Sequence, residues 1–91
     1  MTKKQLVDLV ARKAHLPKRA AEEAVDVFLD EVGRVLGKGE KVVLSGFGTF
    51  KRKRMDGKTV KVPNSEKFVN IKSHWLPRFT PGKALKRRVA R

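Results

Sequence analysis

Positively charged side chains dominate the second half of this 91-residue sequence, and they carry its clearest chemistry. Residues 46–91 contain 14 Lys and Arg against 2 Asp and Glu, whereas residues 1–45 contain 9 against 7. Within the second half, residues 51–61 hold six basic residues and one acid. Ammonium and guanidinium groups bind phosphates, so this clustering predicts a polyanionic partner, either a nucleic acid or an anionic membrane surface.

The rest of the composition argues against several classes of protein. The formal net charge is +14, there is no cysteine, and only Asp56 and Glu66 are acidic in the second half. Disulfides, thiolate metal sites and cysteine nucleophiles are therefore excluded, and no acid/base or metal-ligand set is evident. We expect neither an enzyme nor a cofactor, metal or small-molecule substrate. Apolar runs such as Val42–Leu44 are far shorter than the roughly 20 residues of a membrane span, and no signal peptide is expected.

Two helices are predicted in the first half. Thr2 and Gln5 have the spacing of a capping box, and apolar residues then recur at helical intervals, which predicts a helix over 3–14. Pro17 separates it from a second predicted helix over 18–37, because proline suits the first turn of a helix. The second helix has an apolar face broader than the first helix can cover. Its members are Ala21, Ala24, Val25, Phe28, Leu29, Val32, Val35 and Leu36.

Three acidic side chains, Glu22, Asp26 and Asp30, share one stripe of the second helix. Paired carboxylates can perform general acid/base catalysis, but on a helix rich in opposite charges they are more typical of a solvated, salt-bridged face. We favour the solvated face.

The pattern changes to that of strands after Gly39. Residues 41–44 are β-branched and apolar, Ser45–Gly48 has turn composition, and a strand restarts at Thr49. Two strands joined by a tight glycine turn are predicted. A phosphate-binding glycine loop is disfavoured, because no Lys-Ser/Thr pair follows these glycines.

A long two-stranded arm is predicted next. Lys51, Lys53 and Met55 fall on one face of an extended chain, with Arg52 and Arg54 on the other. Neither face is apolar enough to be buried, so the segment should project from the core. Asp56-Gly57 has the composition of a turn or bulge, residues 60–62 are extended, Pro63–Ser65 forms a tip, and residues 67–72 return.

The last segment, Thr80–Val89, is predicted to be a short basic helix with Pro81 in its first turn. Lys83 and Lys86 lie close to its N-terminal end. They either clamp a phosphate there or belong to a set of cations that complements the helix dipole. We favour the phosphate contact, since Lys83 is at the wrong end for the dipole.

Two motifs carry a resemblance to a known family. Ser45-Gly46-Phe47-Gly48-Thr49-Phe50 and the segment from Arg78 to Lys86 (RFTPGKALK) resemble the two signatures of the bacterial HU/integration host factor family, and the likeness covers essentially the whole chain. It implies an α+β fold: an intertwined dimer with a helical base of two N-terminal helices, a three-stranded antiparallel sheet extended into a two-stranded β-arm, and a short C-terminal helix. Residues 1–91 would form one domain, with a helical dimerisation part (1–39), sheet and arm (40–79) and basic helix (80–91).

The resemblance also implies roles for individual residues. Arm lysines lie along the DNA minor groove, a tip proline wedges between base pairs, and other lysines hold flanking phosphates; four phenylalanines belong to the shared dimer core. Arg52, Arg54 and Lys72 are added on charge and strand position alone, and Arg87 with them as a basic residue of the last helix. The DNA-binding set is Lys3, Arg52, Lys53, Arg54, Lys58, Lys61, Pro63, Lys72, Lys83, Lys86 and Arg87, and the core set is Phe28, Phe47, Phe50 and Phe79.

The arm departs from the family pattern at three places. Relatives usually carry Arg-Asn-Pro followed by Thr-Gly at the tip, where this chain has Lys61-Val62-Pro63-Asn64-Ser65-Glu66, and Met55 stands where arginine is common. Pro63 is therefore either a wedge or a turn-forming proline. Trp75 is not a family hallmark, and it is either a packing residue at the base of the arm or a base-stacking platform.

The expected function is a non-sequence-specific, double-stranded-DNA-binding architectural protein that wraps, bends and compacts DNA in the cytoplasmic nucleoid of a bacterium. A homodimer is expected, or a heterodimer with a paralogue, without a membrane partner. The alternatives are a sequence-preferring bender like integration host factor and, less favoured, a basic RNA-binding protein.

Overall fold

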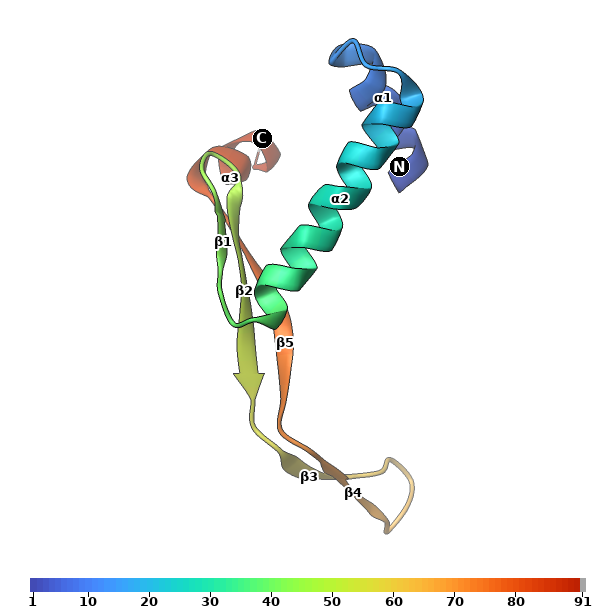
Figure 1. Ribbon diagram of the computed structural model, residues 1–91. Helices are drawn as coiled ribbons and strands as arrows, with labels where there is room; N and C mark the ends of the chain where they lie inside the picture. Colours follow the sequence, from blue (N-terminus) through green and yellow to red (C-terminus); the bar gives the residue numbers. More distant parts are fainter. Residues whose placement is uncertain (91) are drawn as a thin grey trace. The chain divides into compact units, whose positions relative to one another are not determined.

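The computed structural model describes residues 1–90, which form two compact units, residues 1–34 and residues 35 onward. The elements in chain order are α1 (Lys3–Lys13), α2 (Lys18–Gly37), β1 (Val42–Leu44), β2 (Gly48–Met55), β3 (Lys58–Lys61), β4 (Phe68–Ile71), β5 (His74–Pro81) and α3 (Lys83–Val89). Figure 1 shows them in order of colour along the chain. Helices and antiparallel sheets in this order confirm the predicted α+β fold.

The first unit is a pair of helices. The capping box is present, since Gln5 N donates to Thr2 Oγ1 (3.2 Å) and Thr2 N donates to Gln5 Oε1 (2.9 Å). A small apolar centre of Val7, Ala11 and Ala21 is buried between the helices. Helix α2 covers the predicted residues, and α1 ends one residue before the predicted end.

Much of the apolar face of α2 is open to solvent. Phe28 is 47% exposed and Leu29 51%, although both are large hydrophobic residues in the middle of a helix. Burying such side chains stabilises a fold by about 1.5 to 3 kcal/mol each. The chain therefore leaves uncovered a surface that a partner would be expected to bury.

The second unit is built on a three-stranded antiparallel sheet in the order β1-β2-β5. The β1–β2 turn is tight: Phe47 N donates to Leu44 O (2.9 Å), and Gly46 has a φ of 84°, a conformation that glycine adopts without a steric penalty. At Gly48 a Cβ would lie 2.6 Å from the Thr80 carbonyl oxygen and 2.5 Å from the Phe79 ring. The predicted glycine turn is confirmed, and it allows the Phe79 ring to pack against the β2 backbone.

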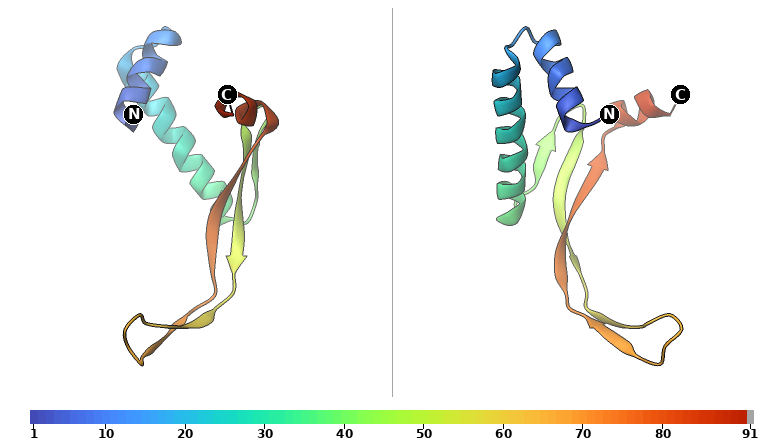
Figure 2. Two further views of the ribbon diagram at one scale, coloured as in Figure 1. Left: turned by 180° about the vertical axis from the view of Figure 1, so that it is seen from behind. Right: turned by 90° about the vertical axis from the view of Figure 1, so that its right-hand side faces the viewer.

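The arm is a continuation of β2 and β5. Strands β3 and β4 form a separate antiparallel pair, with Lys58 opposite Ile71 and Lys61 opposite Phe68. Asp56-Gly57 on one side and Lys72-Ser73 on the other are unpaired, so the ribbon is interrupted there by two residues on each strand. Figures 1 and 2 show the ribbon bending at this point. Asp56-Gly57 thus lies in a break between two ladders and forms neither a turn nor a bulge.

Two boundaries near the end of the chain differ from the prediction. The returning strand is divided into β4 and β5, and Trp75 is the second residue of β5. Pro81 is the last residue of β5, and α3 begins at Lys83 with Gly82 as its N-cap. The position of Pro81 was ambiguous from the sequence, because both the end of a strand and the first turn of a helix tolerate a residue without an N–H.

Candidate nucleic-acid interface

The register of β2 with β5 separates the basic residues of the sheet into two sets. Side chains alternate between the two faces of a strand, and directly paired residues share a face. Lys51 pairs with Arg78 and Lys53 with Leu76, whereas Arg52 pairs with Pro77 and Arg54 with Trp75. The predicted separation of Lys51 and Lys53 from Arg52 and Arg54 is confirmed.

The first set, which we call the basic face, consists of Lys51, Lys53 and Arg78. All three are exposed, and within residues 1–90 no carboxylate lies at salt-bridge distance from them. Their charges are free to bind phosphates. Lys51 and Arg78 were not among the predicted contacts. Arg78 lies in a segment read as part of a C-terminal motif, and only its pairing with Lys51 places it beside the arm lysines.

The second set forms a cluster with an aromatic ring, which we call the Arg–Trp cluster: Arg52, Arg54 and Trp75. The guanidinium carbon of Arg52 lies 4.1 Å from the centroid of the Trp75 ring, and that of Arg54 lies 5.3 Å away. Arg54 Nη2 also donates to Ser73 Oγ (2.7 Å), and Arg52 Nη1 lies 3.5 Å from the Gly37 carbonyl oxygen. Both guanidinium groups already have partners within the protein. Trp75 packs at the base of the arm, as one of its two interpretations predicts, while 47% of it stays exposed.

The arm beyond the break presents lysines at both ends of its ladder. Lys58 and Lys61 begin and end β3, Lys67 precedes β4, and Lys72 lies in the break. All four are exposed. Between them Thr59 Oγ1 donates to Asn70 Oδ1 (2.7 Å) across the two strands. Lys58, Lys61 and Lys72 are therefore brought onto one ribbon with Lys53, as the arm prediction requires.

The arm tip is a turn that contains Pro63. Ser65 N donates to the Val62 carbonyl oxygen (3.2 Å), and Asn64 has a φ of 60°. Proline followed by a residue with positive φ is the arrangement of a type II turn. Val62 N donates to Lys67 O (3.0 Å) and closes the loop. Pro63 thus helps to form the turn and is also exposed at the tip, so its turn-forming role does not prevent it from acting as a wedge.

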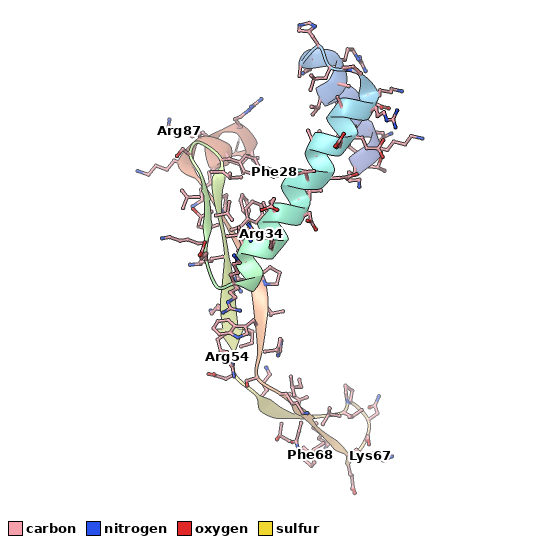
Figure 3. The ribbon with its side chains drawn as sticks, viewed as in Figure 1. Phe28, Arg34, Arg54, Lys67, Phe68 and Arg87 are labelled. Carbon is pink, nitrogen blue, oxygen red and sulfur yellow. The ribbon has the colours of Figure 1, made fainter. Side chains whose placement is uncertain are left out.

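The last helix carries four cations on seven residues. Lys83 is its first residue, and Lys86, Arg87 and Arg88 lie in its last turn. All four side chains are exposed, including Arg87, which is labelled in Figure 3. Lys86 also lines an apolar hollow with Leu85 and Val89. Gly82 provides no side-chain cap. The three predicted residues Lys83, Lys86 and Arg87 therefore belong to the same short helix at the end of β5.

Lys3 is in the first unit and is held by an ion pair. Its Nζ lies 2.8 Å from Asp26 Oδ1, and this hydrogen bond raises the pKa of Lys3 above its ordinary value. Arg34 binds Glu31 (2.8 Å), which lowers the pKa of that carboxyl group. Glu22, Asp26 and Asp30 are all exposed, so the predicted solvated face is confirmed. Of the three, only Asp26 is ion-paired within residues 1–90. A phosphate at this position would compete with Asp26 for the N–H groups of the Lys3 ammonium group.

The predicted core phenylalanines are only partly covered. Phe79 packs on Phe50 and Phe47, with ring centroids 4.7 and 5.5 Å apart, yet Phe47 remains 46% exposed. Phe28, on α2, is labelled in Figure 3. The structure therefore groups three of the four predicted residues: Phe50 and Phe79 are paired on β2 and β5, and Phe47 lies in the turn before β2.

The described residues 1–90 contain no group of three or more His, Cys, Asp or Glu side chains arranged to hold a metal ion. None of their helices has the length and apolarity needed to cross a membrane.

Comparison with known proteins identifies this architecture. The profile of the family described as Bacterial DNA-binding protein matches residues 1–90. The chain is 39% identical over 89 residues to DNA-binding protein HU of Thermotoga maritima, covering 98% of this chain and 99% of that protein. It is 42% identical over 90 residues to DNA-binding protein HU of Helicobacter pylori strain J99, covering 98% and 96%.

A solved structure agrees with these sequence relatives. The Anabaena HU chain in a cocrystal with DNA superposes with a TM-score of 0.93 at 31% identity, covering 99% of this chain and 98% of that one. The match of the whole chain in sequence and in fold leaves one conclusion. The chain belongs to the family of bacterial DNA-binding proteins that includes HU, a family of binding proteins and not of enzymes.

Proposed function

We propose that this protein binds double-stranded DNA as a dimer, without sequence specificity, and bends and compacts it in the bacterial nucleoid. The arms lie in the minor groove, and the basic face and α3 bind the phosphates on either side. Because the bacterial nucleoid lies in the cytoplasm, a cytoplasmic location is part of this proposal.

The observation that carries this proposal is the set of free cations on one ribbon. Lys51, Lys53 and Arg78 on the basic face are exposed and without acidic partners among residues 1–90, and the exposed lysines of the arm continue the series. A DNA backbone carries negative phosphates at regular spacing, so a ribbon that follows it can pair several of its cations with successive phosphates. An isolated two-stranded ribbon is marginally stable in water, so its presence in this fold is best explained by contact with a ligand.

The dimer is supported by the apolar surface that the chain leaves open. Phe28, Leu29 and Phe47 are each about half exposed. A second copy would bury these side chains and bring a second arm to the same duplex. Two arms on one duplex double the number of phosphate contacts and allow the DNA to be held on both sides of a bend.

The absence of sequence preference follows from the kind of contact. Cations bind phosphates whatever the bases, and the minor groove mainly separates A·T from G·C pairs. Preference should instead come from deformability: smooth bending of a 20 to 30 base-pair site costs about 1 to 6 kcal/mol, and nicked or flexible duplexes lower that cost. Insertion of Pro63 would open a base step in return for more contact with the basic surface.

Titration of a labelled duplex at two salt concentrations tests the proposal. Affinity should fall steeply, by about 10³-fold or more for 6 to 10 phosphate contacts, between about 50 and 200 mM salt. Competition with unlabelled duplexes of unrelated sequence should be equally effective, and duplex RNA should compete poorly. Strong preference for one DNA sequence would favour the sequence-preferring alternative. Preference for RNA, or an affinity independent of salt, would overturn the proposal.

A further inference from the structure

Phe68 is the most exposed aromatic side chain among residues 1–90, with 65% of its surface open. The other phenylalanines lie on α2 or in the Phe47, Phe50 and Phe79 group, where rings touch one another. Phe68 lies on β4 near the arm tip, and Figure 3 shows its side chain projecting from the ribbon beside Lys67. It has no ring contact with any residue in 1–90. The fold therefore leaves most of this ring uncovered.

The register defines what surrounds Phe68. It is paired with Lys61 in the last rung before the tip, and it shares a face with Asn70 and with the Thr59 that pairs with Asn70. This face therefore carries a cation, an aromatic ring and an amide side by side. The opposite face carries Lys58, Val60, Val69 and Ile71. Phe68 and Val69 are thus neighbours in the chain that point to opposite sides of the same ribbon.

The charge beside Phe68 selects its partner. Lys61 lies directly across the ribbon on the same face, so whatever covers the ring must offer an apolar surface and also accommodate this cation. A duplex satisfies both requirements, because phosphates line the minor groove while sugars and base faces offer apolar surface. Proteins that bind the minor groove frequently insert apolar side chains, phenylalanine among them, between base steps.

We propose that Phe68 is a second apolar DNA-contacting side chain of each arm, distinct from Pro63, and that its ring packs against an opened base step in the minor groove. Lys61 on the same face binds the adjacent phosphate and holds the ring in place. This inference rests on the proposed function. It adds a residue that the arm lysines and the tip proline do not account for.

A matched pair of variants tests the proposal. Phe68→Ala removes the ring, and Val69→Ala removes a neighbouring apolar side chain that is 48% exposed on the other face. Affinity for a nicked duplex of about 30 base pairs is measured at fixed salt, with 2-aminopurine placed at successive positions to report unstacking. Phe68→Ala should weaken binding about tenfold for each arm, hence about a hundredfold for a dimer, and reduce the 2-aminopurine signal. Val69→Ala should change the affinity by no more than about twofold.

The outcomes separate the two claims. If both variants match the unmodified protein while that protein binds and unstacks the duplex, the assignment of Phe68 is wrong and the proposed function stands. If both variants weaken binding equally, the loss of affinity reflects a general perturbation of the arm and not the loss of the Phe68 ring. That result also overturns the assignment. If the unmodified protein does not bind the duplex, the proposed function itself fails. Thermal unfolding should be unaltered in both variants, since neither side chain belongs to the buried core.

Discussion

The guanidinium group of Arg52 is stacked on the ring of Trp75, with 4.1 Å between the guanidinium carbon and the ring centroid. The two residues are on neighbouring strands, and the same guanidinium group approaches the Gly37 carbonyl oxygen at the end of α2. Arg52 therefore connects the base of the arm to the end of a helix within the same unit. Its neighbour Lys53 points to the opposite face, where no such partner is found for it within residues 1–90.

The first prediction concerns the stability that this stacking provides. In a double-mutant cycle of Arg52→Ala and Trp75→Ala, the coupling between the two side chains should be about 0.5 to 1 kcal/mol, as for a cation–π contact at a partly exposed site. Urea unfolding followed by far-UV circular dichroism at one protein concentration measures it. Strictly additive effects would show that the two groups do not stabilise each other.

The second prediction separates DNA contacts from structural arginines. Lys53→Ala should reduce the slope of log affinity against log salt by about 0.9 for each phosphate that the variant no longer binds, hence by about 2 for a dimer. Arg52→Ala, which removes the same charge from the opposite face, should change the slope by less than half as much. Fluorescence anisotropy at four salt concentrations gives both slopes. Equal changes would mean that the two faces contact DNA alike.

The third prediction concerns Lys3, whose ammonium group is paired with Asp26. Because the pKa of Lys3 is raised, its ammonium group stays charged up to about pH 10.5, and the pair is lost as the pH rises through the raised value. Lys3 is thus charged at neutral pH whether or not it is paired. Asp26→Asn frees it for phosphate, and the salt slope should increase by about 0.9 for each Lys3 that binds a phosphate in the variant.

The control for this variant is Asp30→Asn, which changes the net charge equally on the same helix. No ion pair or hydrogen bond of the Asp30 side chain is found within residues 1–90. If the two variants bind DNA with the same salt slope, Lys3 is not released to a phosphate and its assignment as a DNA-binding residue fails.

The fourth prediction concerns the close approach of Phe79 to Gly48. A Cβ at position 48 would lie 2.5 Å from the Phe79 ring and 2.6 Å from Thr80 O, so Gly48→Ala should destabilise the protein by about 1 to 3 kcal/mol. Gly37→Ala is the comparison, because nothing lies within 4 Å of a Cβ there. Thermal unfolding at equal concentration should show a lower midpoint for Gly48→Ala only. An unchanged midpoint would contradict the packing described.

The helices were predictable from the sequence because their ends carry local signals. Thr2 and Gln5 form the cap of α1, and Pro17 precedes α2, so each boundary depends on neighbouring residues. The break in the arm was not predictable in the same way. It arises where Asp56-Gly57 faces Lys72-Ser73, and the two pairs are far apart in the sequence.

The site was predictable in outline and not in detail. Charge alone treats Arg52, Lys53 and Arg54 alike, and alternation along the strand separates them into two faces. Which face contains the aromatic partner depends on the pairing of Arg54 with Trp75, 21 positions away, and no local pattern reveals that register. For the same reason Arg78 was not recognised as a neighbour of Lys51.

The central claim is that the arms bend the duplex they bind, and energy transfer between dyes at the two ends of a duplex of about 30 base pairs measures this directly. At fixed salt, the unmodified protein should bring the ends closer and raise the transfer efficiency. Pro63→Ala should bind with phosphate contacts intact and bend less, since it lacks the exposed tip side chain. Tight binding with no change in end-to-end distance would contradict the account and would indicate a protein that coats DNA without bending it.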